Sequence, residues 1–423
     1  MLCLDDGSLA PPEGLSGRVN GRFDWALSGA IHLRSRGTML SFHRRQIWTP
    51  EVEIGADDIV HLHSITGFIG ERGLRHLLRK RPRVFWTAHN PWLFTGGCVA
   101  YAGCDRFESG CRRCPLLKFP LERWSRWEFL VKAKFWQEFD VRPIANSEWM
   151  AAMMRRSPLF EGVDIPVVPP IVDEIFTAKA DSRKEILRRI ADDGGLIADS
   201  AVGAKALDAG RVRQWNAEHI PTGSSLDSST PATSHSLPVT APKALGGSRF
   251  VVGLSARSLT DQGKGIDQFF ARLPVDRAFV KETTFVLIGD GGVRVPAGVD
   301  CRFLGHIDSP TRLAEIYRSL DLFVSASAME TFGMAILEAQ ACGTPVVAFE
   351  TGGTPEAVCP FASRLVPNGN FPELFRVVEE MFDVARSEGE KNRKLAEWVA
   401  AKHSWQAIAE TQIKTYSSLL NRG

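Results

Sequence analysis

The stretch SASAMETFGMAILEAQACGTPVV, residues 325–347, follows the short apolar segment Leu322–Val324. Its first half is made of small residues, and Gly333 permits a ligand to approach the backbone where a helix begins. Free N–H groups and the helix dipole at such a point favour a phosphate group. Gly343 ends the helix, and a second apolar run follows it. The stretch therefore predicts a strand, a phosphate-binding loop, a helix and the next strand of an α/β domain.

Further apolar runs recur at regular spacing around this unit, with helical segments between them. We expect strands at Phe250–Ser255, Thr284–Ile288, Asp300–Leu304, Leu322–Val324 and Pro345–Phe349. Short apolar strands that alternate with helices indicate a parallel sheet with crossover helices. In such doubly wound sheets, ligands bind beyond the carboxyl ends of the strands. The loops that follow these strands are therefore the place to look for chemistry.

The N-terminal half shows the same alternation less regularly. We expect its strands at Asp58–His63, Arg83–His89, Val141–Ser147 and Ile165–Pro169. Residues 1–57 are irregular, and residues 193–248 break the alternation, with a stretch rich in Ser, Thr, Pro and Gly at Thr222–Ser236. A segment with so little to bury predicts a disordered insertion. The sequence thus indicates two α/β domains separated by this insertion.

Residues 325–347 contain two glutamates. Glu330 precedes the expected helix and Glu338 lies about two turns inside it, so that their carboxylates reach different parts of an extended ligand. For isolated glutamates, a helix cap and a solvated charge are the simpler explanation. The block as a whole, residues 322–356, resembles the E-x7-E region of the glycosyltransferase group 1 family (family 4), retaining enzymes of the GT-B fold. This resemblance implies two Rossmann-like domains that face each other across a cleft.

Two cations fall where the same family carries an Arg…Lys-Gly signature. Arg257 comes two residues after the first expected strand of the C-terminal unit, and Lys264 precedes Gly265. Arginine offers a rigid fork and lysine a point charge, and both suit a diphosphate leaving group. The alternative for Arg257 is an ordinary cation at a strand end. The segment Gly352–Glu356 resembles the family's loop near the nucleotide, with a simple turn as the alternative.

The resemblance also implies roles for single residues. It places Glu330 near the donor sugar and phosphate, together with the backbone amides of Phe332, Gly333 and Met334. It places Glu338 near the ribose. His89 resembles the catalytic-cleft histidine, although a lone histidine is usually structural. Relatives often carry Asp directly after this histidine, where Asn90 stands here. We therefore expect His89 and Glu330 to be the catalytic residues.

Four of the eight cysteines fall in one segment, residues 98–114: Cys98, Cys104, Cys111 and Cys114. The last two are spaced Cys-x2-Cys, which suits tetrahedral zinc, and four thiolates would close a structural site. The alternative is four reduced thiols packed in a loop. The segment resembles a subgroup of these transferases found in exopolysaccharide and colanic-acid-type gene sets. The family chemistry itself requires no metal or other cofactor.

Residues 123–136 interleave aromatic and basic side chains at helical spacing. Such a helix either touches a membrane surface as a peripheral contact or packs its aromatic side chains on the sheet. The net charge of +2 gives no reason to expect nucleic-acid binding. Neither a secretory signal nor a run of about 18 apolar residues is evident, which favours the cytoplasm, with the inner face of the membrane as an alternative.

The expected domain plan follows from these segments. Residues 58–175 form the N-terminal acceptor domain, residues 176–192 and 249–404 form the donor-binding domain, and residues 405–423 form a helix that crosses back to the first domain. Family members usually open with a strand and a glycine-rich loop, and nothing before Asp58 resembles that unit. We therefore expect an N-terminal domain that lacks its first βα unit.

The resemblance implies transfer of a sugar from a UDP- or GDP-sugar to a saccharide or lipid-linked acceptor, with retention, in exopolysaccharide or cell-surface glycan synthesis. A GT-B sugar-nucleotide epimerase or phosphorylase is the first alternative. A non-catalytic protein that only binds nucleotide sugars is the second.

Overall fold

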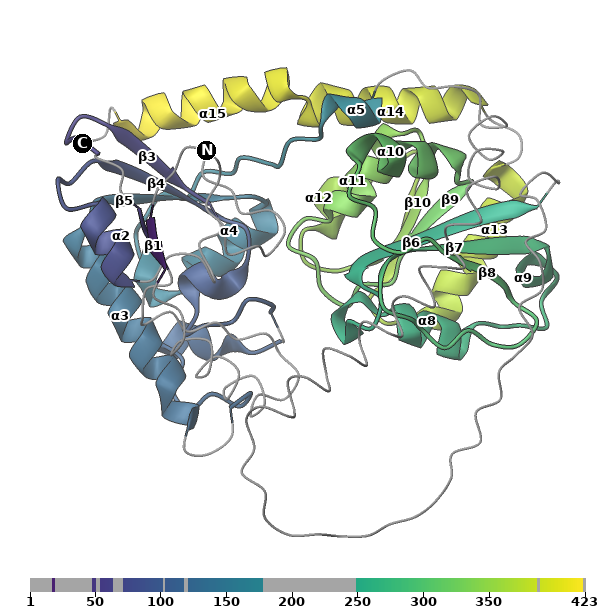
Figure 1. Cartoon of the computed structure of the whole chain (residues 1–423), viewed down its shortest axis with the longest axis horizontal. Coiled ribbons are helices and arrows are strands. Elements are labelled where there is room, and N and C mark those ends of the chain that lie inside the picture. Colours follow the sequence, from purple (N-terminus) through teal and green to yellow (C-terminus); the bar gives the residue numbers. More distant parts are fainter. Residues whose placement is uncertain are drawn as a thin grey trace, which may run out of the picture.

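The computed structural model describes residues 17–19, 48–50, 54–63, 71–101, 103–117, 121–177, 249–385 and 389–420. Within these residues the chain forms two α/β lobes side by side, with two C-terminal helices running along one side of both (Figure 1). We call them the N-lobe (residues 54–172) and the C-lobe (residues 249–385). The predicted insertion and most of the first 57 residues lie outside the described residues.

The N-lobe is built on a parallel sheet whose described strands follow the order β3-β4-β5. A short antiparallel pair, β1 with β2, lies apart from this sheet. The elements of this half are β1 (Gly17–Val19), β2 (Trp48–Pro50), β3 (Ile59–Leu62), α2 (Glu71–Leu77), β4 (Arg83–Ala88), η1 (Pro91–Phe94), η2 (Asp105–Ser109), η3 (Leu121–Arg123), α3 (Trp124–Glu138), β5 (Val141–Ala145), α4 (Glu148–Arg155) and η4 (Pro158–Phe160).

The predicted strand at Ile165–Pro169 is wrong as a full strand. The segment makes a single parallel bridge, between Ala145 and Val167. Pro166 and Pro169 have no N–H group, so the segment cannot donate a regular ladder of hydrogen bonds.

The C-lobe holds a six-stranded parallel sheet in the order β11-β10-β9-β6-β7-β8. Its elements are β6 (Phe250–Ser258), η5 (Gln262–Lys264), α8 (Ile266–Arg272), α9 (Ala278–Glu282), β7 (Thr283–Asp290), β8 (Asp300–Phe303), α10 (Pro310–Ser319), β9 (Leu322–Ser325), α11 (Met334–Ala341), β10 (Val346–Glu350), α12 (Thr354–Ala357), β11 (Arg364–Pro367) and α13 (Phe371–Ala385). The chain builds outward from β6 on one side and then returns to start the other side with β9. The order in which strands are added therefore reverses between β6 and β9, although all six strands are parallel. Doubly wound sheets bind ligands at such a switch point.

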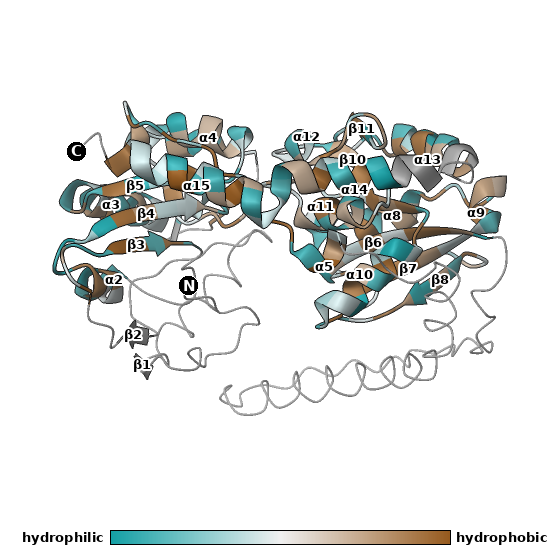
Figure 2. Cartoon of the chain, turned by 90° about the horizontal axis from the view of Figure 1, so that it is seen from above, coloured by the Kyte–Doolittle hydropathy of each residue, from teal (hydrophilic) through white to brown (hydrophobic). Residues whose placement is uncertain are grey.

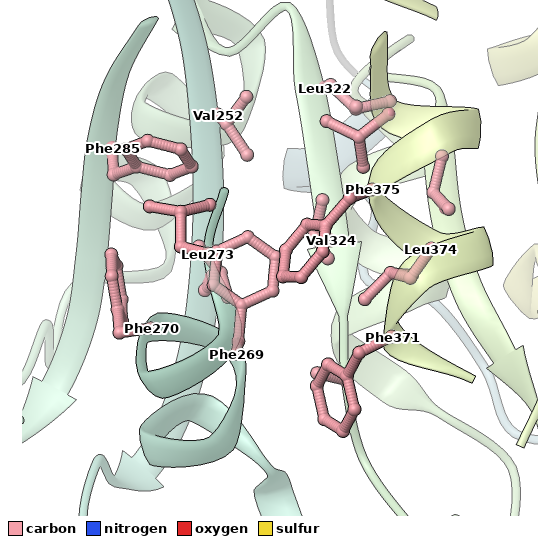
Figure 3. Close-up of a cluster of buried hydrophobic side chains, with 14 of the residues drawn as sticks. Val252, Phe269, Phe270, Leu273, Phe285, Leu322, Val324, Phe371, Leu374 and Phe375 are labelled. Atoms are coloured by element: carbon pink, nitrogen blue, oxygen red, sulfur yellow. The ribbon is translucent and has the colours of Figure 1, made fainter. Parts of the chain in front are cut away.

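Alternation along β6 explains the two hydrophobic layers of the C-lobe. Val252 faces the aromatic side chains of α8 and α13, among them Phe269 and Phe375 (Figure 3). Val251 belongs to the second cluster, on the opposite face, together with residues of α10 and α11. Successive residues of a strand point to opposite faces, so a continuous apolar run predicts a sheet covered on both sides.

Two C-terminal helices, α14 (Gly389–His403) and α15 (Trp405–Leu420), connect the lobes (Figures 1 and 2). Helix α14 contacts α11 of the C-lobe, and α15 places Ile408 and Leu419 in a buried cluster with Phe85 of the N-lobe. The short helix α5 (Glu174–Thr177) packs against α10 and α11 of the C-lobe. None of the described helices is long and apolar enough to span a lipid bilayer.

Candidate active site

Lys264 is held next to the loop that follows β9. It lies in the turn after β6, and Gly265 behind it adopts a φ of +67°. A Cβ at Gly265 would lie 2.1 Å from the carbonyl oxygen of Ala326, so only glycine allows this approach. The N–H of Ala328 also donates to the carbonyl of Gly263 at 2.9 Å. These contacts join the loop after β6 to the loop after β9, at the point where the strand order reverses.

The loop with Glu330 is fixed from its other side by two glycines. The N–H of Gly353 donates to the carbonyl of Glu330 at 2.9 Å. A Cβ at Gly352 would lie 1.8 Å from the same carbonyl oxygen. The Glu330 carboxylate is thereby directed to Lys264, and their Nζ and Oε1 atoms are 2.6 Å apart. Lys264, predicted to bind the donor, and Glu330, predicted to be catalytic, thus form a partly buried ion pair with each other.

Helix α11 begins beside this pair. Gly333 is its N-cap with a φ of 107°, and no side chain caps the first turn. The helix starts at Met334, slightly later than the sequence predicts, because the left-handed conformation of Gly333 cannot belong to the helix. Uncapped N–H groups at a helix start favour an anion. The loop thus sets backbone donors beside the ammonium group of Lys264.

A cavity of about 300 Å³ opens at this point and is bounded by both lobes. Six predicted site residues line it: His89, Lys264, Glu330, Phe332, Gly333 and Met334. Asn146, Ser255, Ser325 and Ser327 also line it. The three serines were missed by the sequence analysis, because a serine in or near a strand is too common to single out.

Arg257 and Glu338 are not among the described residues that line the cavity. Arg257 lies exposed near the end of β6, and its role with the diphosphate stays a prediction. The Tyr317 hydroxyl donates to Glu338 at 3.4 Å. Burial raises the pKa of Glu338 to about 7.

The raised pKa of Glu338 predicts a pH-dependent stability. Its ordinary value is 4.5, so the folded protein binds an extra proton between that pH and about 7. The stability of the wild-type protein should therefore fall as the pH rises through this window. In Glu338→Gln this loss is absent. The free energy of unfolding of the variant, taken relative to that of the wild type, should therefore increase by on the order of 1–3 kcal/mol from pH 5 to pH 8. Melting temperatures at both pH values test this, with the exposed Glu161→Gln as control; a constant difference between Glu338→Gln and wild type contradicts it.

The N-lobe contributes His89 to the cavity. His89 follows β4, and its exposed side chain reaches the cleft. Its Nε2 lies 2.8 Å from Nδ1 of His63. Enclosure by the cleft and the neighbouring His63 lower the pKa of His89, which favours a neutral imidazole. Asn90 accepts a hydrogen bond from the N–H of Trp92 at 3.0 Å and so caps the turn that orients His89.

Direct hydrogen bonds join the lobes beside the cavity. The Ser147 hydroxyl donates to the carbonyl of Thr331 at 2.9 Å. The Glu356 carboxylate accepts from the N–H groups of Glu148 and Trp149, at 2.7 and 3.0 Å, at the start of α4. A carboxylate is favourable at this end of a helix. The loop predicted to lie near the nucleotide thus also connects the lobes.

The cysteine-rich loop, residues 98–114, follows η1 along the chain. Cys98, Cys104, Cys111 and Cys114 line one small pocket of about 20 Å³. The N–H of Gly96 donates to the Cys111 sulfur at 3.0 Å. Burial raises the pKa of Cys98 to about 12 and that of Cys111 to about 11. Among the described residues, no three His, Cys, Asp or Glu side chains are already arranged to hold a metal ion.

Helix α3 packs two of its aromatic residues and one of its lysines inward. Phe129 and Phe135 are buried. Lys132 is buried too, and its Nζ donates to the carbonyls of Trp92 and Thr95 at 2.6 and 2.9 Å. The interleaved pattern thus serves packing for these residues, and the structure gives no support for a membrane contact.

Comparison with known protein families identifies the kind of domain that the C-lobe forms. Residues 249–383 match the family model described as "Glycosyl transferases group 1". These residues form a group 1 glycosyltransferase domain. This domain contains Glu330, predicted to be catalytic, and the predicted donor-binding residues, namely Arg257, Lys264, Phe332, Gly333, Met334 and Glu338.

Two curated relatives and one solved structure extend the comparison. The D-inositol 3-phosphate glycosyltransferase of Segniliparus rotundus is 28% identical over 259 residues, which are 56% of this chain and 57% of that protein. A GDP-mannose-dependent monoacylated alpha-(1-6)-phosphatidylinositol monomannoside mannosyltransferase of Corynebacterium glutamicum is 25% identical over 207 residues, 46% of this chain and 54% of that protein. The chain therefore matches little more than half the length of either relative.

The solved structure is a glycosyltransferase from Rickettsia africae. It aligns with a TM-score of 0.51 and 15% identity, over 86% of this chain and 78% of that one. Identity this low bears on the fold alone. The predicted GT-B class, with two parallel-sheet lobes, is confirmed.

Proposed function

We propose that the protein is a nucleotide-sugar-dependent glycosyltransferase that transfers a hexosyl unit from a UDP- or GDP-sugar to a saccharide or lipid-linked acceptor, with retention. Exopolysaccharide or cell-surface glycan synthesis is the proposed context. One observation carries the proposal. Lys264 and the uncapped start of α11 meet in a cavity at the switch point of the group 1 domain, and His89 of the other lobe lines the same cavity.

The proposed roles follow from charge and position. Lys264 and the N–H groups at the start of α11 stabilise the negative charge that develops on the departing diphosphate. Lys264 leaves Glu330 when the phosphates arrive, and Glu330 then accepts hydrogen bonds from the donor sugar. His89 contacts the transferred sugar from the opposite wall. Binding of the donor between the lobes holds the reacting groups in place.

Retention is proposed from the family resemblance, and the residues that line the cavity bear on how it would be achieved. Among the described lining residues, Glu330 is the single carboxylate, and it is paired with Lys264. A double displacement would need a carboxylate nucleophile on the face of the sugar opposite the leaving group, whereas the proposed role of Glu330 is to accept hydrogen bonds from the donor sugar. Departure and attack on the same face of the sugar need no protein nucleophile, which is the mechanism that we propose.

The relatives support the donor and acceptor classes. The mannosyltransferase relative is named for GDP-mannose and a phosphatidylinositol monomannoside, and the other relative is named for D-inositol 3-phosphate. Both acceptors are polar hydroxyl compounds, and the first carries lipid. The GDP-sugar donor and the lipid-linked acceptor proposed here correspond to the name of the mannosyltransferase.

Thermal stabilisation by nucleotide sugars tests the proposal. The panel consists of UDP-glucose, UDP-N-acetylglucosamine, GDP-mannose and the nucleosides uridine and guanosine. A ligand that binds only the folded protein stabilises it by about 2.7 kcal/mol at one hundred times its Kd. We expect at least one nucleotide sugar to raise the melting temperature by several degrees and its nucleoside to raise it much less. Equal, negligible shifts for every compound contradict the proposal.

Structural zinc in the cysteine-rich loop is a separate proposal. Four thiols line one pocket, and backbone N–H donation to Cys111 is a contact that also stabilises a metal-bound thiolate. The side chains must turn inward to reach a common ion. Elemental analysis of the purified protein should give about one zinc per chain, and none in Cys111→Ser/Cys114→Ser. Cys301→Ser/Cys342→Ser is the control that keeps the zinc. Metal-free wild-type protein after zinc-supplemented expression contradicts this proposal.

A further inference from the structure

Two histidines outside the predicted site lie next to His89. His61 and His63 are two residues apart along β3 and its end, so both side chains lie on the same side of the strand. β3 pairs in parallel with β4, which leads directly to His89. The three imidazoles therefore gather at the same edge of the N-lobe sheet.

His61 is held at both ring nitrogens. Its Nε2 lies 2.8 Å from the hydroxyl of Thr87, and its Nδ1 lies 2.5 Å from the hydroxyl of Tyr416. Tyr416 belongs to α15, which comes from the far end of the chain. Burial, together with the neighbouring imidazoles, lowers the pKa of His61 to about 3, so the ring is neutral. The ring is thus a fixed part of the packing between α15 and the N-lobe sheet.

His63 lies between this fixed ring and the active-site cavity. Its ring centroid is 4.1 Å from that of His61 and 5.1 Å from that of His89. Its carbonyl accepts a hydrogen bond from the indole of Trp86 at 3.1 Å. Its Nδ1 and the Nε2 of His89 are 2.8 Å apart. Both the backbone and the ring of His63 are therefore set before any ligand arrives.

A hydrogen bond between two neutral imidazoles fixes a proton position in each. One of the two facing nitrogens must carry the hydrogen and the other must accept it. His63 and His89 therefore cannot change tautomer independently. The Nε2 of His89 is occupied by this bond, so Nδ1 is the ring nitrogen left to meet a ligand in the cavity.

We infer that His63 is the positioning residue of His89. Its hydrogen bond holds the His89 ring in one orientation and one tautomer, and His61 with Tyr416 of α15 holds the His63 ring in turn. The C-terminal helix thereby stabilises the wall of the cavity opposite the diphosphate site. A merely structural His63 would fill space in the sheet edge without setting the protonation of His89.

Imidazole ¹⁵N spectra of the histidine-labelled protein test this inference without any substrate, with His89→Ala used to assign the signals of His89. In the wild type we expect the two ring nitrogens of His89 to give one protonated-type and one unprotonated-type signal. In His63→Phe, which keeps a ring of similar size, the two signals should move toward each other as the tautomers interchange. His63→Asn keeps a polar group near the position of Nδ1 and should restore the separation. His76→Gln, an exposed substitution on α2, is the control.

Two spectral results overturn the inference: averaged His89 signals in the wild type, or separated signals that His63→Phe leaves unchanged. If His63→Phe does not fold, the separation of the His89 signals in His63→Asn is compared with that in His63→Ala. Because the spectra need no turnover, they stand even if the proposed function fails.

The second readout rests on the proposed function. With UDP-glucose or GDP-mannose as the donor, the kcat for nucleotide release should fall roughly 10- to 100-fold in His63→Phe, because a misplaced reacting group is this costly. The KM should change much less, since the diphosphate site lies in the other lobe. His63→Asn should recover most of the rate. A rise in KM with kcat unchanged contradicts the positioning role.

Discussion

Lys264→Ala is expected to lower nucleotide release from a UDP- or GDP-sugar by about 10²- to 10³-fold, the usual effect of removing one preorganised donor to a developing negative charge. The variant should also lose most of its affinity for UDP or GDP. Lys264 is the one lysine or arginine among the described residues that line the cavity. The start of α11 remains, so a residual rate from its N–H groups is expected.

Controls separate this loss from unfolding. Lys264→Ala leaves Glu330 without its cation, so Lys264→Ala/Glu330→Gln shows whether an unpaired carboxylate causes the effect. Lys281→Ala removes an exposed lysine of α9 in the same lobe and should behave as wild type. If Lys264→Ala turns over normally while folded, Lys264 has no part in the donor site.

Glu330→Gln is expected to separate binding from turnover. The substitution keeps the shape of the side chain and removes the charge that pairs with Lys264. Lys264 then meets the diphosphate without first breaking an ion pair, so the affinity for UDP or GDP should stay the same or increase. The hydrogen bonds from Glu330 to the donor sugar should weaken, and we expect kcat to fall on the order of 10²-fold.

Calorimetry with UDP and GDP and steady-state kinetics measure the two effects in the same preparation. Glu350→Gln is the matched control, because Glu350 ends the neighbouring strand β10 with an exposed side chain. Parallel losses of affinity and turnover in Glu330→Gln would show that Glu330 supports the loop and does not act on the sugar.

The fold could be predicted from the sequence where burial is complete. The strands β6, β7 and β9 are continuous apolar runs because helices cover both faces of the sheet, and their predicted bounds agree with the structure within a few residues. The edge strand β11 escaped prediction, because Arg364–Pro367 has two exposed positions and ends in proline. Most of the N-terminal 57 residues lie outside the described structure, so the expectation of a missing βα unit stays untested.

The residues of the candidate site also differ in whether the sequence alone could predict them. Lys264, Glu330 and Gly333 lie in short local motifs, so the sequence alone points to them. His63 and Tyr416 carry no local signal, since a histidine at a strand end and a tyrosine on a helix are both common. Their contacts depend on strand pairing and on the return of α15 across more than 350 positions, between His61 and Tyr416. Only the folded chain shows them.

The most direct test of the central claim is a crystal structure of the protein with the nucleotide sugar that gives the largest thermal shift. The diphosphate should lie within hydrogen-bond distance of the Lys264 Nζ and the N–H groups at the start of α11, with the sugar between Glu330 and His89. A nucleotide bound elsewhere, with the Lys264–Glu330 ion pair intact, would contradict the claim.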